Sequence, residues 1–261
     1  MIPIRDHNPS QRMAYVTWAL IAANIALHLL VTMQADSDRA LWALYRDFAL
    51  IPAKVSAGQG YGGFVTSVFL HADLLHLAGN MLFLYIFGDN LEDELGHVGF
   101  LGFYLFCGVG AGAAQWLAAP MSPVATIGAS GAIAGVMGGY LLMFPKAKVD
   151  IFVFLVFFIR IFPIPAWIML GLWFGLQLVN GLNGDATAGG VAYWAHAGGF
   201  IIGFLAMLPV FLLRGGTAFW DRNQGRPAHP DAAWGRLSPS AIPAIRRGGP
   251  DQPVPRRGPW P

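Results

Sequence analysis

The sequence holds one serine and several histidines in segments that are otherwise almost entirely apolar. Ser130 opens a run of glycines and alanines, and His196 stands near the start of another such run. A serine hydroxyl becomes a nucleophile when a neighbouring base takes its proton, and histidine, which titrates near neutrality, is the usual base. If the fold brings these two side chains together, they form a nucleophilic pair.

A second polar group lies in the stretch HADLLHLAGN, residues 71–80. His76 and Asn80 are four residues apart and share one face of a helix, whereas His71 need not lie on that face. Donors from His76, Asn80 and the backbone N–H of Ser130 could stabilise the negative oxygen of a tetrahedral intermediate. Loss of one such donor costs about 2.7–4 kcal/mol in a serine protease.

The composition indicates that these groups belong to a membrane protein. Of 261 residues, 56% are hydrophobic and 11% are charged, far from the average of soluble domains. Polar groups inside a membrane are tolerated mainly where they face the bundle interior or a water-filled cavity. We expect an all-α polytopic bundle over residues 13–213, with six crossings at residues 13–33, 68–88, 98–118, 130–144, 151–183 and 191–213.

The first and fifth of these segments need interpretation. The first is too long for a cleaved signal peptide and lacks a small-residue cleavage site, so we expect it to stay attached. Residues 151–183 are too long for one upright helix and too short for two. Arg160, Pro163 and Pro165 indicate a break, so that 151–163 lies along the interface and 165–183 crosses.

Positive charge favours an orientation with both termini on the cytoplasmic side. Residues 1–12 are then a cytoplasmic segment, and residues 214–261, rich in proline and arginine, are expected to form a disordered cytoplasmic tail. In this orientation the tail shares its side with Arg5, Arg12, Lys146, Lys148 and Arg160, while Arg39, Arg46 and Lys54 lie opposite. We expect contact with the lipid bilayer and no nucleic-acid partner.

The expected depths of the hydroxyl and the imidazole agree. A helix from Ser130 to Phe144 has 15 residues and spans about 22 Å, against a hydrocarbon core of about 30 Å. Pro145 and Lys146 hold its C-terminal end at the cytoplasmic side, so Ser130 is expected about 8 Å below the opposite face. The helix that carries His196 starts from that same face, and His196 is expected about 7 Å below it.

Small residues would let these two helices approach closely. Ser130, Ala134 and Gly138 repeat at every fourth position, and Gly199 and Gly203 form a GxxxG pattern on the His196 helix. The predicted helix-packing residues are Gly128, Gly131, Ala134, Gly135, Gly138, Gly199 and Gly203. Three other polar residues, Gln115, Gln177 and Asn180, are interpreted as helix–helix contacts or cavity lining.

Three motifs resemble a known family. The stretches GASGAIAG (128–135), HADLLHLAGN (71–80) and AHAGGFIIG (195–203) are similar, in order and spacing, to the GxSx, HxxxxHxxxN and AHxxGxxxG signatures of the rhomboid intramembrane serine proteases. The resemblance covers roughly residues 62–213 and implies a six-helix rhomboid bundle. It also implies a Ser130–His196 dyad without an acidic third member.

The resemblance further implies roles and substrates. His76 and Asn80 would hold the oxyanion, and His71 would sit in the polar, water-retaining part of the site. The substrates would be transmembrane proteins with a single span, cut in or beside the membrane where small or helix-destabilising residues let the segment unwind. No cofactor or metal is implied, and the oligomeric state is left open.

Two departures from the family pattern are visible. Gly62 and Gly63 stand where some relatives have a Trp-Arg pair in the loop before the second helix. Ala134 stands where some relatives have an aromatic residue packed against the catalytic histidine, so the imidazole has no stacking partner that the sequence identifies.

Other functions fit the sequence less well. The HExxH and GxGD motifs of membrane metalloproteases and aspartyl proteases are absent from the sequence. A transporter with a metal held by His71, His76 and His196 would leave Ser130 unexplained. A catalytically inactive rhomboid-like binding module is the stronger alternative, although both members of the dyad are present. We therefore predict a rhomboid-type serine endopeptidase in a bacterial inner membrane or a similar bilayer.

Overall fold

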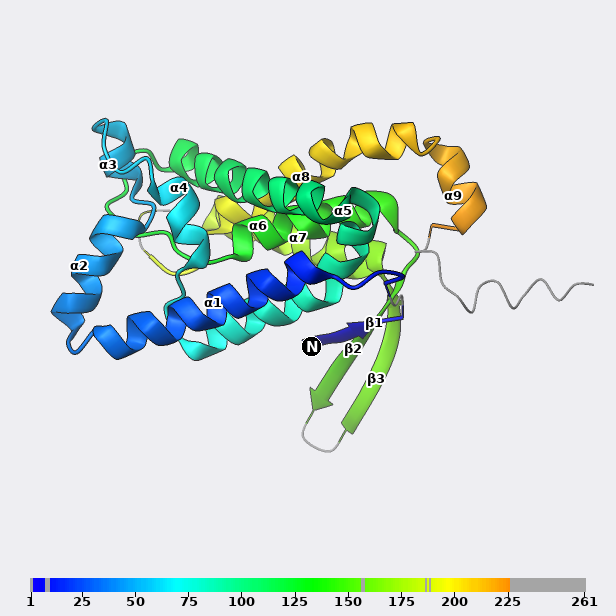
Figure 1. Ribbon diagram of the computed structural model, residues 1–261, viewed down its shortest axis with the longest axis horizontal. Helices are drawn as coiled ribbons and strands as arrows, with labels where there is room; N and C mark the ends of the chain where they lie inside the picture. The colour runs from blue at the N-terminus through cyan, green and yellow to red at the C-terminus, as the bar shows by residue number, and fades with distance from the viewer. Residues whose placement is uncertain (1, 8–9, 156–157, 186, 188, 226–261) are drawn as a thin grey trace, which may run out of the picture. The chain divides into compact units, whose positions relative to one another are not determined.

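The computed structural model describes residues 2–7, 10–155, 158–185, 187 and 189–225, and this part of the chain is mostly helical with one small sheet (Figure 1). Residues 1–229 form one unit of contacts, and a second unit, residues 230–261, lies outside the described residues. The helices are α1 (Tyr15–Gln34), α2 (Asp38–Phe48), α3 (Pro52–Ser56), α4 (Gly63–Thr66), α5 (Leu74–Ala118), α6 (Ser130–Met143), α7 (Ala166–Asn183), α8 (Tyr193–Leu213) and α9 (Thr217–Asn223), with a 3₁₀ turn, η1, at Ser67–Phe69.

Three of these helices, α1, α5 and α8, are long and apolar enough to cross a membrane by length and composition. Helix α5 has 45 residues, and its backbone leaves helical geometry at Gly96, where φ is 70° and ψ is 166°. This positive φ suits glycine, and it divides α5 into two helices joined at a break. Helices α6 and α7 are shorter, with 14 and 18 residues. The predicted count of six crossings stays a prediction.

The expectation of an all-α fold is wrong at residues 148–165. Strands β2 (Lys148–Leu155) and β3 (Phe158–Pro165) form an antiparallel hairpin, and β1 (Ile2–Asp6) pairs with β2 to give the order β1-β2-β3. Valine, isoleucine and phenylalanine dominate the hairpin and favour strands. Its prolines, Pro163 and Pro165, lie on an edge strand, where a missing N–H is tolerated. The predicted break is confirmed, since α7 begins directly after Pro165.

Helix α6 lies at the centre of the described bundle, in contact with α5 and α8 (Figure 1). Its glycines bring backbone against backbone. A Cβ added at Gly203 would lie 2.0 Å from the carbonyl oxygen of Gly135, and one at Gly199 would lie 2.2 Å from that of Gly131. One at Gly138 would lie 2.1 Å from the carbonyl oxygen of Phe200. These distances leave no room for a side chain, so the approach of α6 and α8 depends on these glycines.

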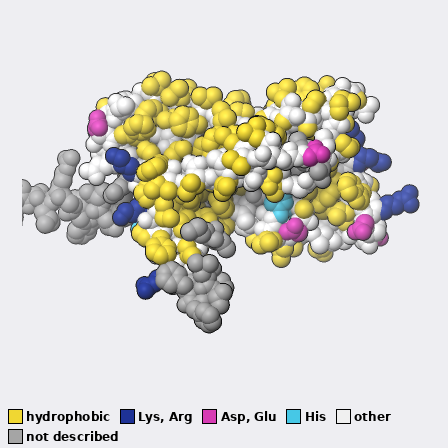
Figure 2. All heavy atoms as spheres, turned by 180° about the vertical axis from the view of Figure 1, so that it is seen from behind, with side chains coloured by type: hydrophobic (Ala, Val, Ile, Leu, Met, Phe, Trp, Pro, Cys, Tyr) yellow, Lys and Arg dark blue, Asp and Glu magenta, His cyan; other side chains and the backbone are white. Residues whose placement is uncertain are grey.

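The outer surface of the helices is apolar. Figure 2 shows a wide band of hydrophobic side chains with few charged side chains within it. Large hydrophobic residues are exposed on the outer helices, for example Met33 on α1, Leu182 on α7 and Leu205 on α8. An exposed apolar surface of this extent is unfavourable in water and favourable in lipid. The chain is therefore a membrane protein built around apolar helices.

The predicted tail begins with ordered structure. Helix α9 occupies Thr217–Asn223. The indole N–H of Trp220 donates to the carbonyl of Leu142 at 3.0 Å, and the N–H of Lys146 donates to the carbonyl of Gly225 at 2.9 Å. The expectation of disorder from residue 214 is therefore wrong for this first part, and residues 226–261 lie outside the described residues.

Candidate active site

The structure brings Ser130 and His196 into direct contact. Ser130 is the first residue of α6, and His196 lies in the first turn of α8. The distance between Ser130 Oγ and His196 Nε2 is 2.8 Å, a hydrogen bond between residues 66 positions apart. Close packing of α6 on α8 through glycine makes this contact possible, because a side chain at Gly199 would push the two helix starts apart.

The other side of the imidazole is held by α7, which sequence reasoning missed. His196 Nδ1 lies 2.9 Å from Oε1 of Gln177, a residue interpreted above as a packing or lining residue. The ring of Trp173 lies beside the imidazole, with centroids 5.8 Å apart and planes at 32°. The imidazole therefore has an aromatic neighbour despite Ala134. The signal was a polar residue four positions after a tryptophan in an apolar helix, which places both on one face.

A second glutamine supports the backbone beside His196. The N–H of Ala195 donates to Oε1 of Gln115 on α5 at 3.2 Å, and both residues are buried. This N–H belongs to the first turn of α8, where backbone donors have no partner within the helix. Gln115 thereby ties the start of α8 to α5.

His76 and Asn80, both on α5, line one cavity together with Ser130 of α6. Asn80 is 8% exposed, and its Nδ2 has no hydrogen-bond partner among the described residues. Gly128 has a φ of +124°, and a Cβ there would lie 2.8 Å from the His76 ring and 3.6 Å from Asn80 Nδ2. Gly128 thus serves the approach of the loop to these side chains, before α6 begins, and not the helix–helix contact predicted for it.

Local hydrogen bonds fix the backbone on both sides of this contact. Asp73 caps the start of α5 by accepting the N–H of His76 at 2.8 Å, and this hydrogen bond lowers the pKa of the exposed Asp73 carboxyl. The loop before α6 is held by two backbone hydrogen bonds between Leu50 and Thr126, of 2.8 and 3.1 Å. The N–H of Gly128 donates to the carbonyl of Ser67 at 2.9 Å.

A cavity of about 870 Å³ opens beside these groups. Its lining includes His76, Asn80, Ser130, Trp173 and His196. It also includes residues of the loop between α7 and α8. The size of the cavity is in the range of small-molecule and cofactor sites, and its lining combines apolar side chains with a few convergent polar groups.

His71 does not line this cavity. It is 2% exposed, and its ring lies edge-on to that of His76, with ring centroids 5.1 Å apart. It lines a separate cavity of about 310 Å³ together with His28 and Tyr45. Among the residues that the structure describes, no group of three or more histidine, cysteine or acidic side chains is arranged to hold a metal ion.

The arrangement has the parts of a nucleophilic site. An amide oxygen can only accept, so the contact with Gln177 assigns the proton of the neutral imidazole to Nδ1 and leaves Nε2 to accept the Ser130 hydroxyl proton. The start of α6 presents free backbone N–H groups and the positive end of the helix dipole. With the unpaired Asn80 amide, these groups can stabilise negative charge beside the serine oxygen.

Comparison with known proteins finds one matching family model and several similar proteins. A family model described as the Rhomboid domain matches residues 58–213. Rhomboid-like protein 11, chloroplastic, of Arabidopsis thaliana is 37% identical over 132 residues, which are 50% of this chain and 43% of that protein. Rhomboid protein 1, mitochondrial, of Saccharomyces cerevisiae is 31% identical over 148 residues, 54% of this chain and 39% of that protein. RHOMBOID-like protein 4 of Arabidopsis thaliana is 30% identical over 181 residues, 68% of this chain and 41% of that protein. The matched parts thus span about two fifths of the length of these relatives.

Proposed function

Because the chain belongs to the rhomboid family, as its match over residues 58–213 shows, we propose that it is an intramembrane serine endopeptidase. The observation that carries this proposal is the hydrogen bond of 2.8 Å between Ser130 Oγ and His196 Nε2. It lies at the edge of a cavity among apolar helices, where a membrane-spanning substrate would be within reach.

The proposed reaction has two steps. Ser130 Oγ attacks the scissile carbonyl carbon while His196 Nε2 takes the hydroxyl proton, and the same nitrogen then donates this proton to the leaving amine. A water molecule, deprotonated by His196 Nε2, then attacks the carbonyl carbon of the acyl-enzyme, and the protonated imidazole returns this proton to Ser130 Oγ as the bond between Oγ and the acyl carbon breaks. In each step the negative oxygen accepts hydrogen bonds from Asn80 Nδ2, His76 and the start of α6, groups that border the same cavity.

The proposed substrates are transmembrane proteins with a single span. An apolar segment that meets the described bundle from the lipid would contact hydrophobic surface and would then have to unwind to expose its backbone to Ser130. Small or helix-destabilising residues lower the cost of that unwinding. The proposed reaction uses no metal or cofactor, since the serine supplies the nucleophile and the histidine moves the proton.

The proposed location is the inner membrane of a bacterium or a similar bilayer, with both termini on the cytoplasmic side. The distribution of lysine and arginine between the apolar segments supports this orientation.

A labelling and cleavage experiment tests the function. Detergent-purified protein is expected to react with a fluorophosphonate probe and to cleave a model single-span substrate, whereas Ser130→Ala and His196→Ala do neither. Equal cleavage by Ser130→Ala would reject the nucleophile. A folded wild type that takes no label and cuts nothing would favour an inactive binding module, and histidine-dependent ion flux would favour a transporter.

A further inference from the structure

We propose that Gln177 is the positioning residue of the site, which holds the His196 imidazole in the one tautomer and orientation that can accept the Ser130 proton. The inference rests on the proposed function, because it assigns a role within the same reaction. It adds a third, uncharged member to a pair that the family resemblance leaves without an acidic partner.

The hydrogen bonds of Gln177 fix both ends of its amide. Gln177 is 8% exposed, and its Oε1 lies 2.9 Å from His196 Nδ1. Its Nε2 donates to the carbonyl of Trp173 at 3.4 Å, so the oxygen end faces the imidazole. Since this oxygen can only accept, Nδ1 carries the proton and Nε2 presents its lone pair to Ser130.

The consequence for catalysis follows from the two neutral tautomers of histidine. An imidazole protonated at Nε2 has no lone pair directed at Ser130 and cannot take its proton. Removal of the acceptor at Nδ1 lets this unproductive tautomer become populated and lets the ring turn about its χ2 angle. The ring of Trp173, with its centroid 5.8 Å from that of His196, offers no hydrogen-bond acceptor to Nδ1 and cannot replace Gln177 in this role.

Helix α7 also supplies a matched control. Asn183 Nδ2 donates to the carbonyl of Val179 at 2.7 Å, the same side-chain contact to the residue four positions earlier that Gln177 makes. Asn183 is exposed and does not line the cavity. Replacing it therefore removes a polar side chain from α7 without touching the imidazole.

The first measurement is steady-state kinetics on the full chain in detergent with the model single-span substrate. Gln177→Met keeps the length of the side chain and removes the acceptor. We expect kcat to fall about 10- to 100-fold, below the full contribution of a general base of about 10²- to 10⁴-fold. KM and the melting temperature should match those of the wild type, and Asn183→Leu should keep the wild-type kcat within about twofold, since surface substitutions have small effects.

The second measurement reports the tautomer directly. In protein labelled with ¹⁵N-histidine, the His196 signal is assigned by its absence in His196→Ala. We expect an Nδ1-protonated neutral ring in the wild type and a shift toward the Nε2-protonated form in Gln177→Met. Gln177→Glu retains an acceptor oxygen and should keep the wild-type tautomer and more activity than Gln177→Met.

The outcomes separate the two proposals. An active wild type with unchanged kcat and tautomer in Gln177→Met would overturn the role of Gln177 alone. If kcat and the melting temperature both fall in Gln177→Met while the tautomer stays the same, the positioning role is overturned in favour of a packing role. A wild type that cleaves nothing would overturn the proposed function, while the ¹⁵N signals would still decide whether Gln177 sets the tautomer.

Discussion

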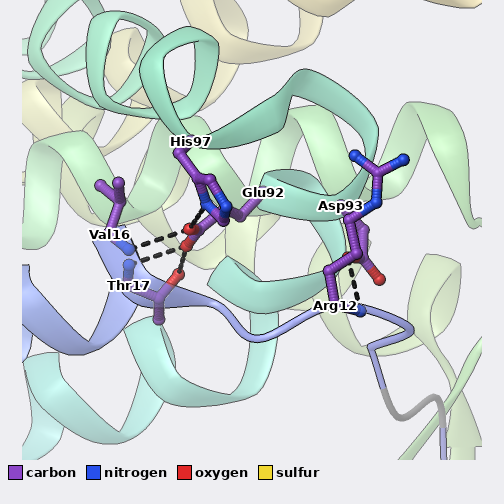
Figure 3. A network of polar contacts seen from close by, with 6 residues as sticks. All are labelled: Arg12, Val16, Thr17, Glu92, Asp93 and His97. Atoms are coloured by element: carbon purple, nitrogen blue, oxygen red, sulfur yellow. Dashed lines mark hydrogen bonds and ion pairs between the residues drawn. The ribbon is translucent and has the colours of Figure 1, made fainter.

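Two polar clusters lie inside the apolar bundle, and they differ in how completely their hydrogen bonds are paired. At one, around Glu92, the carboxylate is 2% exposed and accepts hydrogen bonds from the N–H groups of Val16 and Thr17 at 2.9 and 2.8 Å and from Thr17 Oγ at 2.7 Å. His97 Nδ1 lies 2.6 Å from the same group (Figure 3). The acceptor oxygens are saturated, and they satisfy the first-turn donors of α1.

The cluster around Ser130 has hydrogen-bonding capacity left over. Asn80 Nδ2 has no partner among the described residues, and a cavity of about 870 Å³ lies beside it. Both clusters are built on α5, with His76 and Glu92 16 positions apart, about 24 Å along a helix. Saturated groups hold helices in place, whereas an unpaired donor next to a cavity is available for a ligand. Three substitution series test this distinction, and a fourth tests the backbone contact between α6 and α8 that holds the second cluster together.

The largest effect is expected at Asn80. Asn80→Ala removes a proposed oxyanion donor, so kcat/KM should fall about 10²- to 10³-fold, or about 2.7–4 kcal/mol. The free energy of unfolding should change little, because Nδ2 of the lost amide has no hydrogen-bond partner among the described residues. Cleavage kinetics and thermal denaturation in the same detergent measure the two quantities.

Asn90 on the same helix is the matched control. Its Nδ2 donates to Asp6 at 3.0 Å and to Asp89 at 2.9 Å. Asn90→Ala should therefore lower stability by about 1–3 kcal/mol and leave kcat of the folded protein unchanged. If both substitutions lower stability and neither lowers activity, the distinction between the two clusters is wrong.

The next effect concerns the backbone contact that joins α6 to α8. Gly203→Ala places a Cβ 2.0 Å from the carbonyl oxygen of Gly135, which should destabilise the fold near the top of the range of about 1–3 kcal/mol for overpacking. Gly102→Ala on α5 meets nothing within 4 Å and should be neutral or stabilising by up to about 1 kcal/mol. The melting temperatures of the two variants test this prediction. Equal values would contradict the close approach of α6 and α8.

A smaller loss is expected at Glu92. Glu92→Gln replaces one acceptor oxygen with a donor that faces other donors, so stability should fall by about 1.5–3 kcal/mol, with kcat of the folded fraction unchanged. Asp93, at a more exposed position, accepts the N–H of Gln11 at 2.6 Å. It also accepts the N–H of Arg12 at 3.1 Å (Figure 3). Asp93→Asn should cost about 0.5 kcal/mol or less. A loss of activity without a loss of stability in Glu92→Gln would place this cluster in the reaction.

The sequence allowed the prediction of the serine–histidine contact because depth along a helix depends only on residue counts and on charges that mark the ends. The contact with Gln177 was not predictable in this way. It depends on how α7 is rotated about its own axis, and an apolar helix facing both lipid and protein carries no amphipathic pattern to specify that rotation.

The hairpin at residues 148–165 was missed for a related reason. An apolar run does not distinguish a strand from a buried or membrane helix by periodicity, and only its valines, isoleucines, phenylalanines and prolines pointed to strands. The glycine pattern predicts a packing role for Gly128, whereas its positive φ of 124° serves a tertiary contact with His76 that no local pattern reveals.

The smallest effect is expected at a third polar cluster, which joins β1 to β2. Asp150 is buried and accepts a hydrogen bond from Arg5 Nε at 2.8 Å, and His7 Nε2 lies 2.6 Å away. Burial favours the neutral acid, but the hydrogen bonds from Arg5 and His7 outweigh it and lower the pKa of Asp150 below its ordinary value of 3.8. Arg5 is largely exposed, so solvent weakens its share of this effect.

The sign of the pH dependence follows from that lowered pKa. A carboxyl with a lower pKa in the folded state contributes stability above its unfolded pKa, and this contribution is lost as the pH falls through the folded value. Protection of the β1 and β2 amides from hydrogen exchange should therefore be constant above about pH 5 and should decrease below about pH 4. Asp150→Asn should lower protection at neutral pH and flatten this dependence, whereas Asp47→Asn, at an exposed position, should leave the curve unchanged. An undiminished pH dependence in Asp150→Asn would assign the transition to another carboxyl. The cluster at Asp150 would then differ from the saturated cluster around Glu92.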